Sequence, residues 1–229
     1  MKALLYCFEY MGNKYNEKEG EFLMGTDVYM KKTVDSSVLK NELITTAGLW
    51  IDGKAFWLKT GTEKLLIDES MSIQLKKENI HSKIHFFEIY LTNHSSVDRR
   101  ALLLFMHQHQ EATRDHFSFI SPSENVIYHL ANNRVYLVNG QINGNAEGQR
   151  TVQPYWNFYN DLIWSNLEKG VLKYNPMTKG AAVSIFSLET IIPPNKTIKG
   201  SSWVIMDDKK LKLERLNKAF LKKRTSISN

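Results

Sequence analysis

The residues best suited to chemistry are histidines in the run LLLFMHQHQEATRDHF (102–117), which holds three of the chain's seven histidines. His107 and His109 are two positions apart, so on a β-strand both imidazoles project from the same face. β-Rich metalloproteins can present two imidazoles to one transition metal in this way. His116 lies close enough in the sequence to supply a further ligand.

A metal centre also needs a ligand from a distant strand and partners that orient the imidazoles, and the sequence identifies neither. Glu111 and Asp115 are carboxylates near the histidines, but Glu111 follows the pair too soon for the known double-histidine barrel motif. The pattern favours a strand whose apolar part, 102–106, lies in the core and whose polar end, 107–110, emerges into a loop. We therefore predict no metal site and no cofactor.

A second candidate site is the aromatic segment PYWNFYNDLIWSN (154–166), in which rings alternate with amide and carboxylate groups. A sugar ring offers an apolar C–H face and a hydroxyl edge, and binding sites in general combine apolar walls with a few polar groups. We predict ligand-binding residues here, with carbohydrate as one ligand that fits: Tyr155, Trp156, Asn157, Tyr159 and Trp164. The same rings could instead attach a long connection to the core by burying their area, and this alternative stays open.

Sequence patterns typical of β-strands predict the fold that would hold both candidate sites. Asp52-Gly53 separates two apolar runs and predicts a tight hairpin, as Asn132-Asn133 does farther along the chain. Residues 70–77 alternate apolar and polar side chains, which is typical of a half-buried strand. Long β-type runs are joined at Asn93-His94-Ser95-Ser96 and at Pro193-Pro194. The sequence predicts an all-β fold, a large two-sheet antiparallel β-sandwich of about 12 or more strands.

Helical periodicity is confined to the C-terminal part of the chain. Leu213, Leu216 and Phe220 form an apolar stripe, and Asp207 and Asp208 are suitable N-caps. We predict an amphipathic helix over 207–224 that packs on the sandwich, followed by a tail over 225–229. The loop-like composition of 140–148 does not separate regions of different composition, so we predict one domain over 1–229.

Composition and charge bear on three classes of protein: polyanion-binding, disulfide-rich and membrane-spanning proteins. The net charge is +6, but the segment 207–229 contains eight basic and three acidic residues, so the preceding part is nearly neutral. The basic helix could contact a polyanion, although no recognised nucleic-acid module accompanies it, and we do not expect a nucleic-acid partner. With Cys7 as the single cysteine, no disulfide framework forms, and no apolar run is long enough to span a membrane. We expect a cytoplasmic protein.

Two strand-turn-strand runs, FFEIYLTNHSSVDRRALLLF and IIPPNKTIKGSSWVIM, resemble edges of the large β-sandwiches of the galactose-mutarotase-like class, often called supersandwiches. Members of that class bind or act on carbohydrates, and its enzymes use a histidine and a glutamate as acid and base. The resemblance covers about half of the chain and includes no catalytic signature, so no catalytic residue is carried over. It implies sandwich architecture and a link to sugars.

Strong β patterning without an assembled catalytic set predicts a non-enzymatic or accessory β-sandwich that binds a ligand or a protein partner. The competing hypothesis is a carbohydrate-active enzyme of the mutarotase or epimerase type. In that case an imidazole would act as acid or base beside the aromatic segment, and the candidates are His107, His109, His116 and His129. A third hypothesis is polyanion binding by the basic helix.

Overall fold

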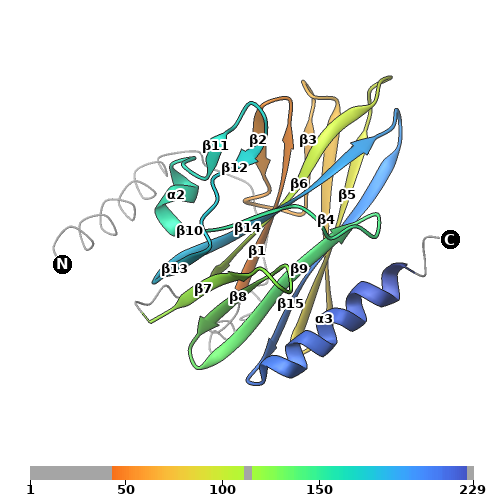
Figure 1. Cartoon of the computed structure of the whole chain (residues 1–229). Helices are drawn as coiled ribbons and strands as arrows, with labels where there is room; N and C mark the ends of the chain where they lie inside the picture. Colours follow the sequence, from red (N-terminus) through yellow and green to blue (C-terminus); the bar gives the residue numbers. More distant parts are fainter. Residues whose placement is uncertain (1–42, 111–114, 226–229) are drawn as a thin grey trace, which may run out of the picture. The chain divides into compact units, whose positions relative to one another are not determined.

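The computed structural model describes residues 43–110 and 115–225, and most of these residues lie in strands (Figure 1). The strands are β1 (Leu43–Ile51), β2 (Lys54–Trp57), β3 (Glu63–Leu66), β4 (Met71–His81), β5 (Ile84–Asn93), β6 (Arg99–His109), β7 (Phe117–Ser121), β8 (Val126–Ala131), β9 (Arg134–Ile142), β10 (Gln149–Pro154), β11 (Trp164–Asn166), β12 (Val171–Leu172), β13 (Met177–Lys179), β14 (Ala182–Ile192) and β15 (Thr197–Asp207). The helices are α2 (Tyr155–Tyr159) and α3 (Lys210–Thr225). The prediction of an all-β fold with a C-terminal helix is confirmed.

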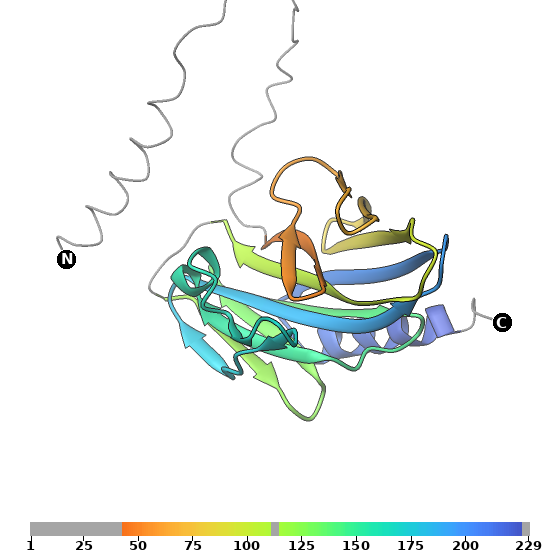
Figure 2. The ribbon, with the colours of Figure 1, turned by 90° about the horizontal axis from the view of Figure 1, so that it is seen from above.

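The strands form two large antiparallel sheets that face each other. The five-stranded sheet has the order β10-β14-β6-β1-β2, and the eight-stranded sheet has the order β13-β7-β8-β9-β15-β5-β4-β3. Because side chains alternate along a strand, β6 sends Leu103 and Phe105 into the main core between the sheets, while Leu102 and Leu104 pack on the outer face of their sheet. Figure 2 shows the two layers with α3 outside them.

Two hairpins form at the turns that the sequence predicts. Ile51 pairs with Lys54 across Asp52-Gly53, and Ala131 pairs with Arg134 across Asn132-Asn133. All four turn residues have positive φ angles, between 47° and 77°. Asp, Asn and Gly adopt this left-handed conformation more readily than other residues, so the turn chemistry explains both hairpins.

The other two predicted turns do not close hairpins. β5 lies in the eight-stranded sheet and β6 in the five-stranded sheet, so the connection between them crosses from one layer to the other. The Pro193-Pro194 turn does the same between β14 and β15. The strands joined by these turns are therefore not hydrogen-bonded to each other: β6 pairs with β1 and β14, whereas β5 pairs with β4 and β15.

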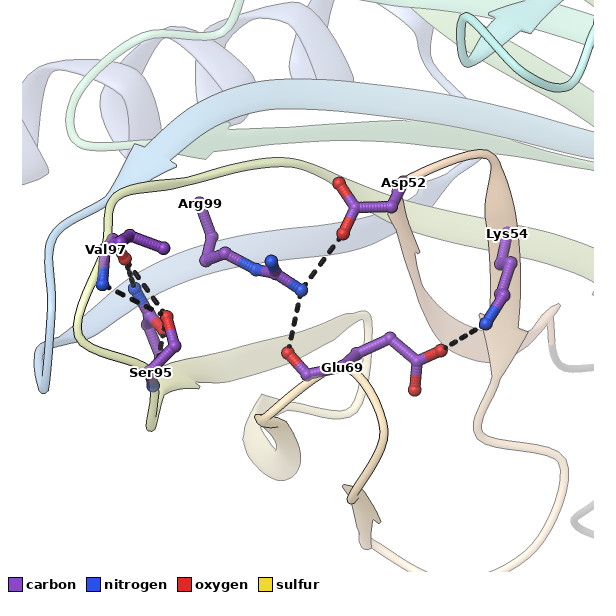
Figure 3. A network of polar contacts seen from close by, with 7 residues as sticks. Asp52, Lys54, Glu69, Ser95, Val97 and Arg99 are labelled. Atoms are coloured by element: carbon purple, nitrogen blue, oxygen red, sulfur yellow. Dashed lines mark hydrogen bonds and ion pairs between the residues drawn. The ribbon is translucent and has the colours of Figure 1, made fainter.

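A network of polar contacts fixes the β1–β2 hairpin beside the turn that precedes β4 (Figure 3). Arg99 forms an ion pair with Asp52 at 3.0 Å and donates to the backbone carbonyl of Glu69 at 3.0 Å. Lys54 Nζ lies 2.9 Å from Glu69 Oε1. This hydrogen bond holds the pKa of the Glu69 carboxyl below its ordinary value although burial opposes the shift. The network joins three separate chain segments.

Helix α3 covers the outer face of the eight-stranded sheet. Leu213, Leu216 and Phe220 pack against an apolar cluster of that sheet, so the predicted stripe is confirmed. The helix begins three residues later than predicted because Asp207 still pairs with Val135 as the end of β15. The basic side chains of Lys209, Lys212, Arg215, Lys218 and Lys222 are exposed.

The described residues belong to one compact unit, Ser37–Asn229, and no boundary divides it near 140–148. Of that segment, 140–142 is the end of β9, so only its later part forms the expected loop. Cys7, Glu111 and residues 226–229 lie outside the described residues, and the single-domain prediction for 1–229 stays a prediction. Within 43–110 and 115–225, no helix has the length and apolar character that crossing a membrane requires.

Candidate functional site

Helix α2 lies on the outer face of the five-stranded sheet, opposite to the face that forms the main core. It directly follows β10, and Pro154 occupies its N-cap position. Phe158 is buried and its ring meets that of Trp57 edge to face, with centroids 5.0 Å apart. Phe158 belongs to an apolar cluster with Met106 and Ile185 of the sheet. This packing gives the short helix a fixed position.

Three other rings of α2 form what we call the aromatic surface: Tyr155, Trp156 and Tyr159. Trp156 is 37 % exposed and Tyr159 is 44 % exposed, whereas Tyr155 is half-buried. The ring of Tyr155 lies 5.8 Å from that of Trp156 and 4.4 Å from that of Tyr159. Burial, together with a hydrogen bond to Tyr159, raises the pKa of the Tyr155 hydroxyl, which is therefore neutral at physiological pH.

Polar groups border this surface. Asn157 Nδ2 donates to Gln153 Oε1 at 2.9 Å, and Gln153 Nε2 donates to Thr151 Oγ1 and to the Lys173 carbonyl, both at 2.7 Å. These bonds hold the Asn157 amide in one orientation. The Asn157 amide thus places a hydrogen-bonding group next to the rings of Trp156 and Phe158 in the chain.

Trp164, the remaining predicted ligand residue, has a different environment. It is half-buried in β11 and packs with Trp57 and Leu104 on the outer face of the five-stranded sheet. Trp164 and Phe158 therefore attach the 154–172 connection to the sheet, as the alternative interpretation of this segment proposed. The sequence did not separate these anchoring rings from the exposed ones.

The histidine segment does not emerge into a loop as predicted. His107 is fully buried and His109 is 9 % exposed. Both positions still belong to β6, which pairs with β1 through His109 and with β14 through Gln108. Because His107 and His109 continue the strand face of Phe105, they point into the space between the sheets.

The structure brings four histidines into one buried region. The rings of His109 and His116 lie 4.6 Å apart. His129 contacts Ser118 Oγ at 2.8 Å and Ser184 Oγ at 2.7 Å, so both of its ring nitrogens face serine hydroxyls. His107 Nε2 lies 3.3 Å from Ser202 Oγ.

Three observations describe the surroundings of these histidines. Among the described residues, no three His, Cys, Asp or Glu side chains are placed to hold a metal ion. Asp115, a nearby carboxylate, is exposed. The described partners of the His129 ring are serine hydroxyls and not carboxylates.

Comparisons with known proteins identify no family. No protein-family model matches the chain, and no curated protein matches it. The resemblance to the galactose-mutarotase-like class therefore stays a prediction, with no family assigned.

Three solved structures of carbohydrate-acting enzymes are among those similar to the chain. A bacterial glucoamylase complexed with acarbose has 8% identity and a TM-score of 0.45, with 80% of this chain and 30% of that chain covered. A putative kojibiose phosphorylase from the human microbiome has 14% identity and a TM-score of 0.35, with coverages of 82% and 21%. A polysaccharide lyase has 10% identity and a TM-score of 0.38, with coverages of 77% and 28%. The chain therefore spans less than a third of the length of each.

Proposed function

We propose that the protein binds carbohydrate through the aromatic surface of Tyr155, Trp156 and Tyr159, without catalysing a reaction there. The observation that carries the proposal is the exposure of Trp156 and Tyr159 on a helix that the buried Phe158 fixes in place. Exposed rings on a fixed element lose little conformational freedom when a ligand stacks on them. Asn157, held by Gln153, supplies a polar group at the side of the rings.

Alanine at Trp156 is expected to weaken oligosaccharide binding at least about tenfold, because the ligand loses its largest stacking ring. The measurement is isothermal titration of the full chain with a panel of soluble oligosaccharides of differing linkage. Tyr174→Ala is the matched control, since Tyr174 is an aromatic residue outside α2 and is 67% exposed. Equal losses in Trp156→Ala and Tyr174→Ala, or no binding across the panel, would refute the proposal.

A protein partner is the second candidate, and a concentration of exposed apolar residues after α2 favours it. A large contiguous patch of exposed apolar side chains marks an interaction site, and several exposed apolar residues in one segment are consistent with such a patch. The exposed apolar residues of this segment, α2 included, are Trp156, Tyr159, Leu162, Leu167, Val171, Tyr174 and Met177. A blank result across the sugar panel would favour this candidate.

A further inference from the structure

The four buried histidines form a polar region inside an otherwise apolar layer, and we call them the histidine cluster. His107 and His109 come from β6, His129 from β8, and His116 from the residue before β7. Their exposed fractions are 0%, 9%, 3% and 5%, respectively. Charge on one ring acts on the others, because positive charge at His109 or His116 disfavours protonation of His129, and His129 acts in the same way on His107.

The contacts of His107 define which of its nitrogens carries the proton. Ser202 Oγ donates its hydrogen to the Asn139 carbonyl at 3.1 Å, so the serine can only accept a hydrogen bond from His107 Nε2. The proton therefore lies on Nε2, and Nδ1 has no hydrogen-bond partner among the described residues. A second proton would place a charged N–H at Nδ1 without an acceptor, beside the rings of Phe105 and Phe186, whose centroids lie 6.5 and 5.8 Å from that of His107.

His129 is held neutral for a different reason. Its two serine partners could accept hydrogen bonds from a charged ring, so hydrogen bonding does not oppose protonation. Burial opposes it, and repulsion from His109 and His116 adds to the effect, which lowers the pKa of His129 to about 3. Burial, followed by repulsion from His129, also lowers the pKa of His107 well below its ordinary value.

The described hydrogen-bond partners of His107 and His129 are neutral hydroxyl groups. β7, β14 and β15 contribute the hydroxyls of Ser118, Ser184 and Ser202. The titratable groups described as acting on these two imidazoles are other histidines, His129 on His107, and His109 and His116 on His129.

We propose that the histidine cluster is an acid-sensitive element, which forces the sandwich open when the pH falls below about 6. In the opened state the imidazoles are hydrated and can be protonated. In the folded state burial disfavours their protonation. The folded protein then loses stability progressively as the pH falls, without any change in its surface ion pairs.

The direction and the size of the change in stability with pH follow from proton linkage. His107 and His129 have lower pKa values in the folded state than in the unfolded state, where histidine titrates near about 6.5. Below that pH the unfolded state binds up to two more protons, so its population rises about 100-fold for each pH unit. Carboxylates contribute mainly below about pH 4.5, so the range from about pH 6 to 4.5 reports on histidine.

The experiment is urea unfolding of the full chain at a series of pH values from about 7.5 to 4.5, followed by circular dichroism. The wild-type unfolding constant is expected to rise by close to 100-fold per pH unit in the lower part of this range. His129→Gln is expected to reduce the rise to about tenfold, because an amide can bond both serines but does not titrate. His94→Gln is the matched control, since His94 is exposed and its Nε2 lies 2.9 Å from the hydroxyl of Ser72.

His107→Phe provides a second test, because a phenyl ring is similar in shape to an imidazole, can pack beside Phe105 and Phe186, and cannot bind a proton. If both substitutions unfold the chain, the wild-type rise alone decides the matter. A wild-type rise below tenfold per pH unit, or an equal flattening in His94→Gln, would show that the cluster does not control acid sensitivity.

Discussion

Replacing Trp203 with alanine is expected to lower the free energy of unfolding by about 3 to 5 kcal/mol and to loosen α3 from the sheet. Trp203 is fully buried in β15, at the centre of the contact with the helix. Its ring stacks with Phe86 at 6.4 Å and with Phe220 of α3 at 5.6 Å. Its Nε1 donates to Asn217 Oδ1 of the same helix at 2.9 Å. Alanine removes the stacking and leaves a cavity at this contact.

Urea unfolding at neutral pH measures this loss, and the far-ultraviolet circular dichroism of the native state reports the helix. Trp203→Phe is the matched control, because it keeps a stacked ring and removes only the hydrogen bond to Asn217. Asn217 Oδ1 still accepts from Asn139 Nδ2 at 3.2 Å, so this variant is expected to lose only about 1 to 2 kcal/mol. The same loss in both variants would mean that the ring contacts do not hold α3.

The features that the sequence predicted are those that depend on neighbouring residues. The stripe of Leu213, Leu216 and Phe220 identifies α3 because helical periodicity is a local property. The turns at Asp52-Gly53 and Asn132-Asn133 identify hairpins because their residues accept positive φ angles. The start of α3 was misplaced by pairing between Asp207 and Val135, which are distant in the sequence.

The choice of sheet for each strand could not be predicted in this way. A turn sequence such as Asn93 to Ser96 permits both a hairpin and a crossing, and the choice depends on which distant strands pair with β5 and β6. The burial of His107 had a usable signal, since it continues the face of Leu103 and Phe105. Residue type favoured exposure for this histidine, but pairing of β6 on both sides overrode that preference.

For the candidate site too, local features were predictable from the sequence and features that depend on distant residues were not. Sequence composition located the aromatic segment, because rings and amides stand next to each other in the chain. It could not separate Trp156 and Tyr159, which are exposed, from Phe158, which is buried. That separation depends on Trp57, about 100 residues away in the sequence, and on Met106 and Ile185 of the outer face of the five-stranded sheet.

Asn93 is expected to be the most sensitive polar position in the described part of the chain, with a loss of roughly 3 kcal/mol on replacement by alanine. Its side chain is fully buried at the point where β5 leaves the eight-stranded sheet. Nδ2 donates to the carbonyls of Val97, Ile192 and Pro193 at 2.7, 2.9 and 3.2 Å. The two crossing connections are therefore joined through one amide group.

The amide oxygen of Asn93 forms hydrogen bonds within the connection between β5 and β6. Asn93 Oδ1 accepts hydrogen bonds from the backbone N–H of Ser95 at 2.9 Å and from Ser95 Oγ at 2.7 Å. Alanine would remove the Asn93 donor from the Ile192 and Pro193 carbonyls, whereas the Val97 carbonyl can still accept from Ser95 Oγ. Loss of a donor to a buried carbonyl is costly because water cannot replace it. Asn93→Asp tests this reasoning, since it keeps the acceptor and the shape but removes both donated hydrogens. It is expected to be at least as destabilising as alanine.

Urea unfolding of four variants separates these contributions. Ser95→Ala removes one of the bonds to Oδ1 and is expected to cost about 1 kcal/mol. Asn166→Ala is the matched control, because Asn166 is an exposed residue at the end of β11 whose Oδ1 accepts from the backbone N–H of Lys169 at 3.0 Å. If Asn93→Ala stayed within about 1 kcal/mol of the control, strand pairing alone would hold the crossings. A large loss in Asn93→Ala and Asn93→Asp with a small one in Asn166→Ala would show that the buried amide joins the two sheets.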